Sequence, residues 1–152
     1  MKPLFSKKSE IRIRVAAVIT NSKKEILLLR QMKHGRSYWL LPGGGIEESE
    51  SAIRALKREL KEELSLSVKK ANFLAFNECV GPKGKRHIIQ MIFGVKTKKG
   101  LPALNKDEKA VLEFRYFSMK SLKNIEIRPD CKKFLQRGKF KPSPHIESKW
   151  IE

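Results

Sequence analysis

The sequence predicts a single α/β domain in which a mixed β-sheet lies between layers of helix. Segments with the apolar patterns of strands occur on both sides of one strongly amphipathic helical segment, residues 50–64, and such an arrangement places helices on the faces of a sheet. The chain has 152 residues, 40% of them hydrophobic, which suffices for one buried core. Because no internal repeat divides it, we expect one domain over residues 1–152, with a basic leader at 1–9 and a tail at 139–152.

Three strand patterns precede the helical segment. Residues 11–20 begin with alternating apolar and polar side chains and end in an apolar run, which predicts a strand that passes from an edge into the core. Residues 25–30 predict a second, buried strand. Residues 38–41 predict a short strand that Pro42 ends, and the glycines at 43–45 predict a turn into the helix.

Three strand patterns and a short helix follow the helical segment. Residues 68–80 and 86–97 have strand composition and are separated by the Gly-Pro-Lys-Gly turn at 81–84, so they predict a hairpin. Residues 113–118 predict another strand, and residues 130–137 predict a final helix.

The helical segment has three distinct faces. Glu59, Glu62 and Glu63 follow one another at spacings that place them on one edge, because each residue turns a helix by about 100°. The apolar stripe that should be buried consists of Ile53, Leu56, Leu60 and Leu64. The remaining face, toward solvent, carries Arg54, Lys57 and Lys61.

The crowded carboxylates of this helix have two interpretations. They can form an ordinary hydrated acidic edge, which is the better explanation for an isolated Glu-Glu pair. They can also surround a divalent cation, since like charges repel unless a cation lies among them. Carboxylate oxygens suit Mg²⁺ or Mn²⁺, which retain water ligands and also bind phosphates.

A wider pattern resolves this choice. Residues 44–66 match G-x5-E-x7-R-E-U-x-E-E-x-G-U, where U is a bulky apolar residue, so the segment resembles the signature of the Nudix hydrolases. The matching residues are Gly44, Glu50, Arg58, Glu59, Leu60, Glu62, Glu63 and Leu66. One position departs, because Ser65 stands where the family has glycine. We expect this serine to alter the helix C-cap rather than the chemistry, at a cost of about 1 kcal/mol for a left-handed backbone.

The resemblance implies an α/β/α sandwich and a reaction, namely cleavage of a pyrophosphate bond in a nucleoside diphosphate linked to another group. It implies that Glu59, Glu62 and Glu63 hold Mg²⁺ or Mn²⁺, with the backbone carbonyl of Gly43 as a further ligand. The signature residues Gly44, Glu50 and Arg58 would have a structural role, in which the Glu50–Arg58 pair ties the turn to the helix.

The signature does not identify the general base. Glu59 is one candidate, and a downstream loop can supply another acid. The acids available there are Asp107, Glu108 and Glu113. We favour Glu108, because it lies in a connection before a strand, from which a loop can reach the metals.

Basic and aromatic residues near the signature are candidates for binding substrate. The candidate phosphate ligands are Arg30, Lys33, Arg36 and Arg86, although a hydrated surface role is the default for each. Tyr38 and Trp39 have two interpretations, as stacking surfaces for a base or as core side chains before the Pro-Gly-Gly turn.

The net charge of the chain bears on its substrate. Lys and Arg number 34 against 16 acids, a formal charge of +18, which attracts polyanions unless it only reflects a lysine-rich proteome. We favour a nucleoside 5′-triphosphate or a 5′-triphosphorylated RNA end as substrate, with release of pyrophosphate. ADP-ribose or a nucleotide sugar is the alternative, and a domain that binds nucleotide or RNA without cleaving it is a third interpretation.

The remaining features concern the setting of the protein. Cys79 and Cys131 lie far apart with no zinc-like spacing, so neither a disulfide scaffold nor a zinc site is indicated. The N-terminal residues lack the apolar stretch of a signal peptide, and no apolar run reaches membrane-spanning length. We therefore expect a cytoplasmic protein without a membrane partner or an obligate protein partner.

Overall fold

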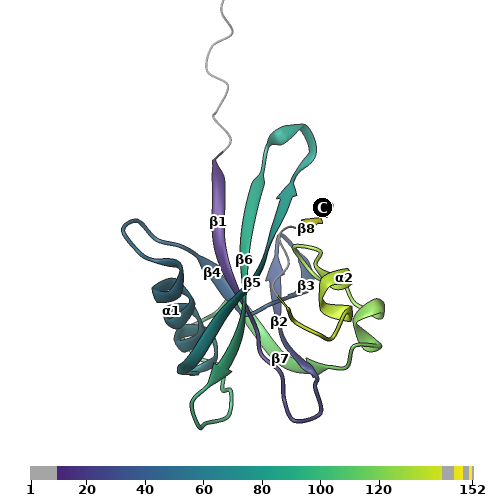
Figure 1. The fold of residues 1–152 in the computed structure, drawn as a ribbon. Coiled ribbons are helices and arrows are strands. Elements are labelled where there is room, and N and C mark those ends of the chain that lie inside the picture. Colours follow the sequence, from purple (N-terminus) through teal and green to yellow (C-terminus); the bar gives the residue numbers. More distant parts are fainter. Residues whose placement is uncertain (1–9, 142–145, 149–150, 152) are drawn as a thin grey trace, which may run out of the picture.

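The computed structural model describes residues 10–141, 146–148 and 151 (Figure 1). The predicted leader at 1–9 and half of the predicted tail at 139–152 lie outside these residues. The strands are β1 (Ile11–Val18), β2 (Ile26–Lys33), β3 (Arg36–Leu40), β4 (Gly43–Gly45), β5 (Val68–Val80), β6 (His87–Thr97), β7 (Val111–Phe117) and β8 (Ile146–Ser148). The helices are α1 (Ala52–Leu64) and α2 (Lys132–Gln136), with 3₁₀ turns η1 (Pro82–Gly84) and η2 (Ser121–Asn124).

The α/β class and the mixed sheet are confirmed, and the strands divide between two sheets. The larger sheet has the order β4-β1-β6-β5-β8, and the smaller has the order β3-β2-β7. In the larger sheet β1 runs parallel to β6, while β5 and β6 form the predicted antiparallel hairpin. Helix α1 lies on one side of the molecule beside β1 and β4, and α2 lies on the other side near β3 (Figure 1).

The core has two parts, one on each side of the larger sheet. Alternate residues of β1 contribute to them, because successive side chains of a strand point to opposite faces. Val15 and Ala17 pack with the apolar face of α1, whereas Ala16 and Val18 pack with Leu122 of η2 and with α2. Strand β1 thus contributes to both parts of the core, as β2 and β6 also do, and only its last four residues are buried.

The apolar stripe predicted for α1 is confirmed at three of its positions. Leu56, Leu60 and Leu64 are fully buried. The prediction was wrong for Ile53, which lies in the first turn of the helix and is 37% exposed. The helix also starts two residues later than expected, after Ser51, whose hydroxyl accepts a hydrogen bond from the Arg54 amide.

The glycines at 43–45 form a strand rather than a turn. They pair antiparallel with β1, with Val15 opposite Gly44 and Ala16 opposite Gly43. A Cβ atom on Gly43 would lie 2.1 Å from the Val15 carbonyl oxygen, and its φ of 140° is one that other residues rarely adopt. Glycine is therefore required for the close approach that leads the chain into α1.

Ser65 ends α1 in the conformation that glycine would take. Its φ of 56° and ψ of 23° are left-handed, and its amide donates to the Lys61 carbonyl while the Leu66 amide donates to that of Leu60. The expected alteration of the C-cap is therefore wrong: serine keeps the backbone of a glycine cap, with a strain of about 1 kcal/mol.

Other strand predictions are confirmed with shifted ends. The second strand extends to Lys33, because β2 continues into a tight hairpin with β3 that the polar sequence did not reveal. Strand β8 was not predicted; it pairs with the free edge of β5, a position that depends on the finished sheet rather than on local sequence. No helix in the described part of the chain is long and apolar enough to cross a membrane.

Candidate active site

The acidic edge of α1 faces the glycine strand β4 at close range. A Cβ atom on Gly44 would lie 2.3 Å from the Glu59 Oε1 atom, so glycine leaves the space that this carboxylate occupies. The Gly43 amide donates a hydrogen bond of 2.8 Å to Glu63 Oε2. The signature glycines thus bring a strand backbone into direct contact with the carboxylates of the helix.

Arg58 connects the glycine strand, the loop before α1 and the acidic edge. Its guanidinium donates to both carboxylate oxygens of Glu50, at 2.9 and 2.8 Å, and to the Gly45 carbonyl at 3.0 Å. The paired guanidinium lowers the pKa of Glu50 to about 2. Glu50, in turn, raises the pKa of Arg58 above its usual value. This bidentate pair ties the loop to the helix, as the resemblance implied.

Arg58 also contacts two of the proposed metal carboxylates. Its Nη1 atom lies 2.9 Å from Glu59 Oε1 and 3.3 Å from Glu62 Oε2. Burial raises the pKa of Glu59, and the contact with Arg58 opposes that increase. A cation that bound Glu59 and Glu62 would take over part of the neutralisation that Arg58 supplies here.

Glu63 is the most deeply buried acid of the site. Its side chain is 7% exposed and forms no ion pair with a described residue. Burial raises the pKa of Glu63 to about 8, although the Gly43 hydrogen bond and the charge of Arg14 favour its ionised form. The charges of Glu59 and Glu108 raise this pKa further, which places Glu108 within electrostatic reach of the site.

Arg14 is a site residue that the sequence analysis missed. Its Nη2 atom donates to the Gly43 carbonyl at 3.2 Å, while its Nε atom is buried without a hydrogen-bond partner. Burial lowers the pKa of its guanidinium. The available signal was the alternation Ile-Arg-Ile-Arg at 11–14, which places Arg12 and Arg14 on one face of the strand.

The carboxylate oxygens of the site are ligands that suit a divalent cation. Glu59, Glu62 and Glu63 offer carboxylate oxygens, and Glu63 is a buried acid that forms no ion pair with a described residue. As the side chains stand, the described residues contain no group of three acids, histidines or cysteines gathered closely enough to ligate one ion. Two of the carboxylates are turned toward Arg58, so binding an ion requires them to rotate. The Gly43 carbonyl, the other expected ligand, already accepts from Arg14 and retains one lone pair.

Beside the acidic edge, the space between the two sheets opens into a cleft of about 2510 Å³. Its acids include Glu59, Glu63 and Glu108. Its basic residues are Arg12, Arg14, Lys33, Arg36, Lys83, Lys85, Arg86 and Arg128. Four of the expected residues, Lys33, Arg36, Arg86 and Glu108, are therefore brought to the same cleft.

The structure does not bring Arg30 or Trp39 to the lining of this cleft. Arg30 lies 3.7 Å from Glu113 on the neighbouring strand β7. The Trp39 ring packs edge-on against Phe117, with centroids 4.6 Å apart, in agreement with the core interpretation. The aromatic side chain that does line the cleft is Tyr38, with the Arg128 guanidinium 5.0 Å from its ring centre.

These features define an α/β domain with an acidic, glycine-backed site at the edge of a basic cleft. The chain belongs to the Nudix family: the family model described as NUDIX domain matches residues 10–138. Solved structures with the same fold include a MutT protein from Methanosarcina mazei Go1, with a TM-score of 0.72 and 23% identity over 88% of this chain and 96% of that one.

Curated relatives match the chain over a shorter length. An 8-oxo-dGTP diphosphatase from Buchnera aphidicola is 39% identical over 53% of this chain and 63% of the relative. An RNA pyrophosphohydrolase from Ruthia magnifica is 45% identical over 42% of this chain and 35% of the relative. The alignments thus span about a third to two thirds of these relatives' lengths.

Proposed function

We propose that this protein is a metal-dependent pyrophosphohydrolase that acts on a nucleoside 5′-triphosphate or a 5′-triphosphorylated RNA end and releases pyrophosphate. The observation that carries the proposal is that Glu59 and Glu63 of the acidic edge line a cleft in which eight Lys and Arg side chains outnumber five acids. The carboxylates suit a divalent cation, and the cleft suits the anionic remainder of the substrate.

The size and charge of the cleft favour a long anionic substrate. A volume of about 2510 Å³ exceeds the ~300–1,000 Å³ of typical small-molecule sites. Lys83, Lys85 and Arg86 at the tip of the β5–β6 hairpin add cationic side chains to its wall. RNA affinity depends largely on neutralised phosphates, so this lining supports the RNA end over a compact sugar nucleotide. One relative is named as an RNA pyrophosphohydrolase, which agrees with the RNA end, and the other as an 8-oxo-dGTP diphosphatase, which agrees with a nucleoside triphosphate.

The residues of the site have distinct roles in the proposed reaction. Glu59, Glu62 and Glu63 would hold Mg²⁺ or Mn²⁺, which when bound stabilises charge on phosphate oxygens and favours water as a nucleophile. The Gly43 amide orients Glu63, and Arg58 orients Glu59. Glu108 lines the cleft near Glu63 and is our candidate to accept the proton of the attacking water, with Glu59 as the alternative.

Arginine side chains of the cleft would position the phosphates. Arg36 and Arg86 line it on different elements, and Arg14 lies between the cleft and the Gly43 carbonyl. Guanidinium groups bind phosphate in a bidentate manner, which can hold the scissile bond next to the carboxylates.

A substrate comparison tests this proposal. Purified protein is incubated with Mg²⁺ or Mn²⁺ and equal concentrations of 5′-triphosphorylated RNA, nucleoside triphosphates, ADP-ribose and a nucleotide sugar, and released products are separated by chromatography. We expect pyrophosphate from the triphosphates or the RNA, and a rate on RNA that falls steeply with salt. Monophosphates from ADP-ribose or the sugar nucleotide, with no triphosphate cleavage, would contradict the proposed substrate. The Glu63→Gln variant is the control for contaminating phosphatases, because it should lose all activity. If the wild-type protein binds RNA but cleaves nothing, the non-catalytic alternative is indicated.

A further inference from the structure

The helix that carries the acidic edge has a second, oppositely charged surface. Lys57 and Lys61 each lie two positions from Glu59, which places them on the other side of α1 at about 100° per residue. Together with Lys98, beyond the end of β6, they border a hollow of about 250 Å³ between the helix and the start of β5. This lysine hollow shares no lining residue with the cleft of the proposed active site.

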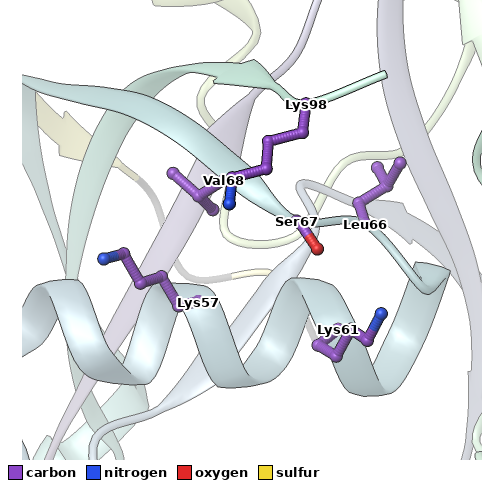
Figure 2. A pocket seen from close by; sticks show the side chains of 6 residues that line it. All are labelled: Lys57, Lys61, Leu66, Ser67, Val68 and Lys98. Atoms are coloured by element: carbon purple, nitrogen blue, oxygen red, sulfur yellow. The ribbon is translucent and has the colours of Figure 1, made fainter. Parts of the chain in front are cut away.

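The groups of the hollow come from both layers that form it. Figure 2 shows Lys57 and Lys61 extending from the helix in opposite directions and Lys98 extending from the sheet side, with the Ser67 hydroxyl between Lys98 and Lys61. The Lys98 amide donates to the Ser67 carbonyl at 2.8 Å, so the backbone that carries the third lysine is joined to the wall of the hollow. Leu66 and Val68 complete the lining with apolar side chains. Three lysines and one serine therefore line a space large enough for a phosphate group.

The positive charges of the hollow are not paired with acids in the described part of the chain. None of the three lysines forms an ion pair with a described residue. The adjoining sequence does not supply acids either, because residues 64–77 and 79–106 contain lysines and arginines but neither Asp nor Glu. Like charges four residues apart on a helix repel each other and destabilise the helix. Lys61 has a structural explanation in the last turn of α1, where a cation complements the helix dipole, but Lys57 and Lys98 do not.

We propose that the lysine hollow is a second anion site, which binds a phosphate group independently of the acidic edge. Lysine ammonium groups bind phosphate as point charges, and an anion there removes the mutual repulsion of the three side chains. The phosphate can come from the backbone of a nucleic acid that extends around the domain or from free pyrophosphate, and the two sources are separated by the experiment.

The experiment follows backbone amide signals of the whole protein by NMR in EDTA, so that no metal-dependent binding contributes. One titration uses inorganic pyrophosphate, and the other uses a single-stranded RNA oligonucleotide with a 5′-hydroxyl end. The reporters of the hollow are Ser67, Val68 and Lys98, while Gly43 and Gly44 report on the active site. The test variant carries Lys57→Gln and Lys98→Gln. The control variant carries Lys23→Gln and Lys123→Gln, which are exposed residues elsewhere on the protein, and it has the same change in net charge.

In the wild type, we expect the amide signals of the hollow to shift until they saturate. The affinity for the titrated ligand should be at least about fivefold weaker in the test variant and unchanged in the control variant. A response to pyrophosphate alone identifies a free phosphate site, and a response to the oligonucleotide alone identifies a backbone contact. For the oligonucleotide, the slope of log affinity against log salt should decrease by about 0.7 per lost phosphate contact. Absence of saturable shifts with both ligands, or equal affinities of the two variants, would overturn the proposal. Neither result depends on hydrolysis, so failure of this site is distinguishable from failure of the proposed reaction.

Discussion

Glu63→Gln should stabilise the metal-free protein while it removes the proposed reaction. Glu63 is buried, and burial raises its pKa to about 8 from an ordinary value of 4.5. When the pKa of a carboxyl group is higher in the folded state than in the unfolded state, its contribution to the free energy of unfolding is greatest below the unfolded pKa. This contribution is lost as the pH rises from the unfolded pKa to the folded pKa. Glutamine remains neutral at every pH, and its side-chain carbonyl can still accept the Gly43 hydrogen bond.

The size of the effect follows from the pKa values. Each pH unit between 4.5 and 8 costs the wild type about 1.4 kcal/mol relative to a neutral side chain, and no further cost arises above pH 8. The difference between variant and wild type should therefore be near zero at pH 4, on the order of 3 kcal/mol at pH 7, and on the order of 5 kcal/mol at pH 9. At pH 7 this corresponds to a rise in melting temperature of roughly 6–12 °C for a domain of this size.

Urea denaturation in EDTA at pH 4, 7 and 9 measures this difference directly. Glu62→Gln is the matched control, because the Glu62 side chain is 49% exposed and remains hydrated, so its effect should be below about 1 kcal/mol at each pH. Saturating Mg²⁺ should stabilise the wild type and leave Glu63→Gln nearly unchanged. A stability difference that does not grow between pH 4 and pH 9 would refute the reasoning, since it would mean that Glu63 is ionised in the folded protein without cost.

Three further substitutions test individual contacts of the site. Gly44→Ala should reduce the turnover number strongly and change the free energy of unfolding only slightly. The reason is that a Cβ atom 2.3 Å from Glu59 Oε1 would displace that carboxylate. Full activity of the variant in steady-state kinetics would contradict this geometry. Glu50→Gln should lower the stability of the protein at neutral pH, because it weakens the contact with Arg58. The pKa of Glu50 is lowered to about 2, so the difference in stability between wild type and variant should shrink as the pH falls from about 4.5 toward 2, which thermal melts can measure. Glu108→Gln should reduce the turnover number by roughly 10²-fold or more with little change in substrate affinity, and an unchanged turnover number would remove it as general base in favour of Glu59.

The local chemistry of the site could be predicted because it depends on spacing along one helix. Glu59, Glu62 and Glu63 share an edge whatever surrounds the helix, and the signature pattern predicted the pairing of Arg58 with Glu50. These predictions needed no information about neighbouring strands.

Other residues could be assigned only from the tertiary structure. Trp39 and Arg36 belong to the same strand, yet Arg36 lines the cleft and Trp39 packs on Phe117, because alternate side chains meet different neighbours. Arg14 reaches the Gly43 carbonyl across twenty-nine positions of sequence, a contact that only the pairing of β1 with β4 creates.

The sequence by itself determined the family, the α/β class and the order of charges around α1, since all three depend on residue types at fixed spacings. The tertiary structure decided which basic side chains face the carboxylates, how deeply Glu63 is buried and how the lysines of α1 meet Lys98. The physical reason is that solvation and charge balance depend on the layers packed around a residue, and those layers come from segments far apart in the chain.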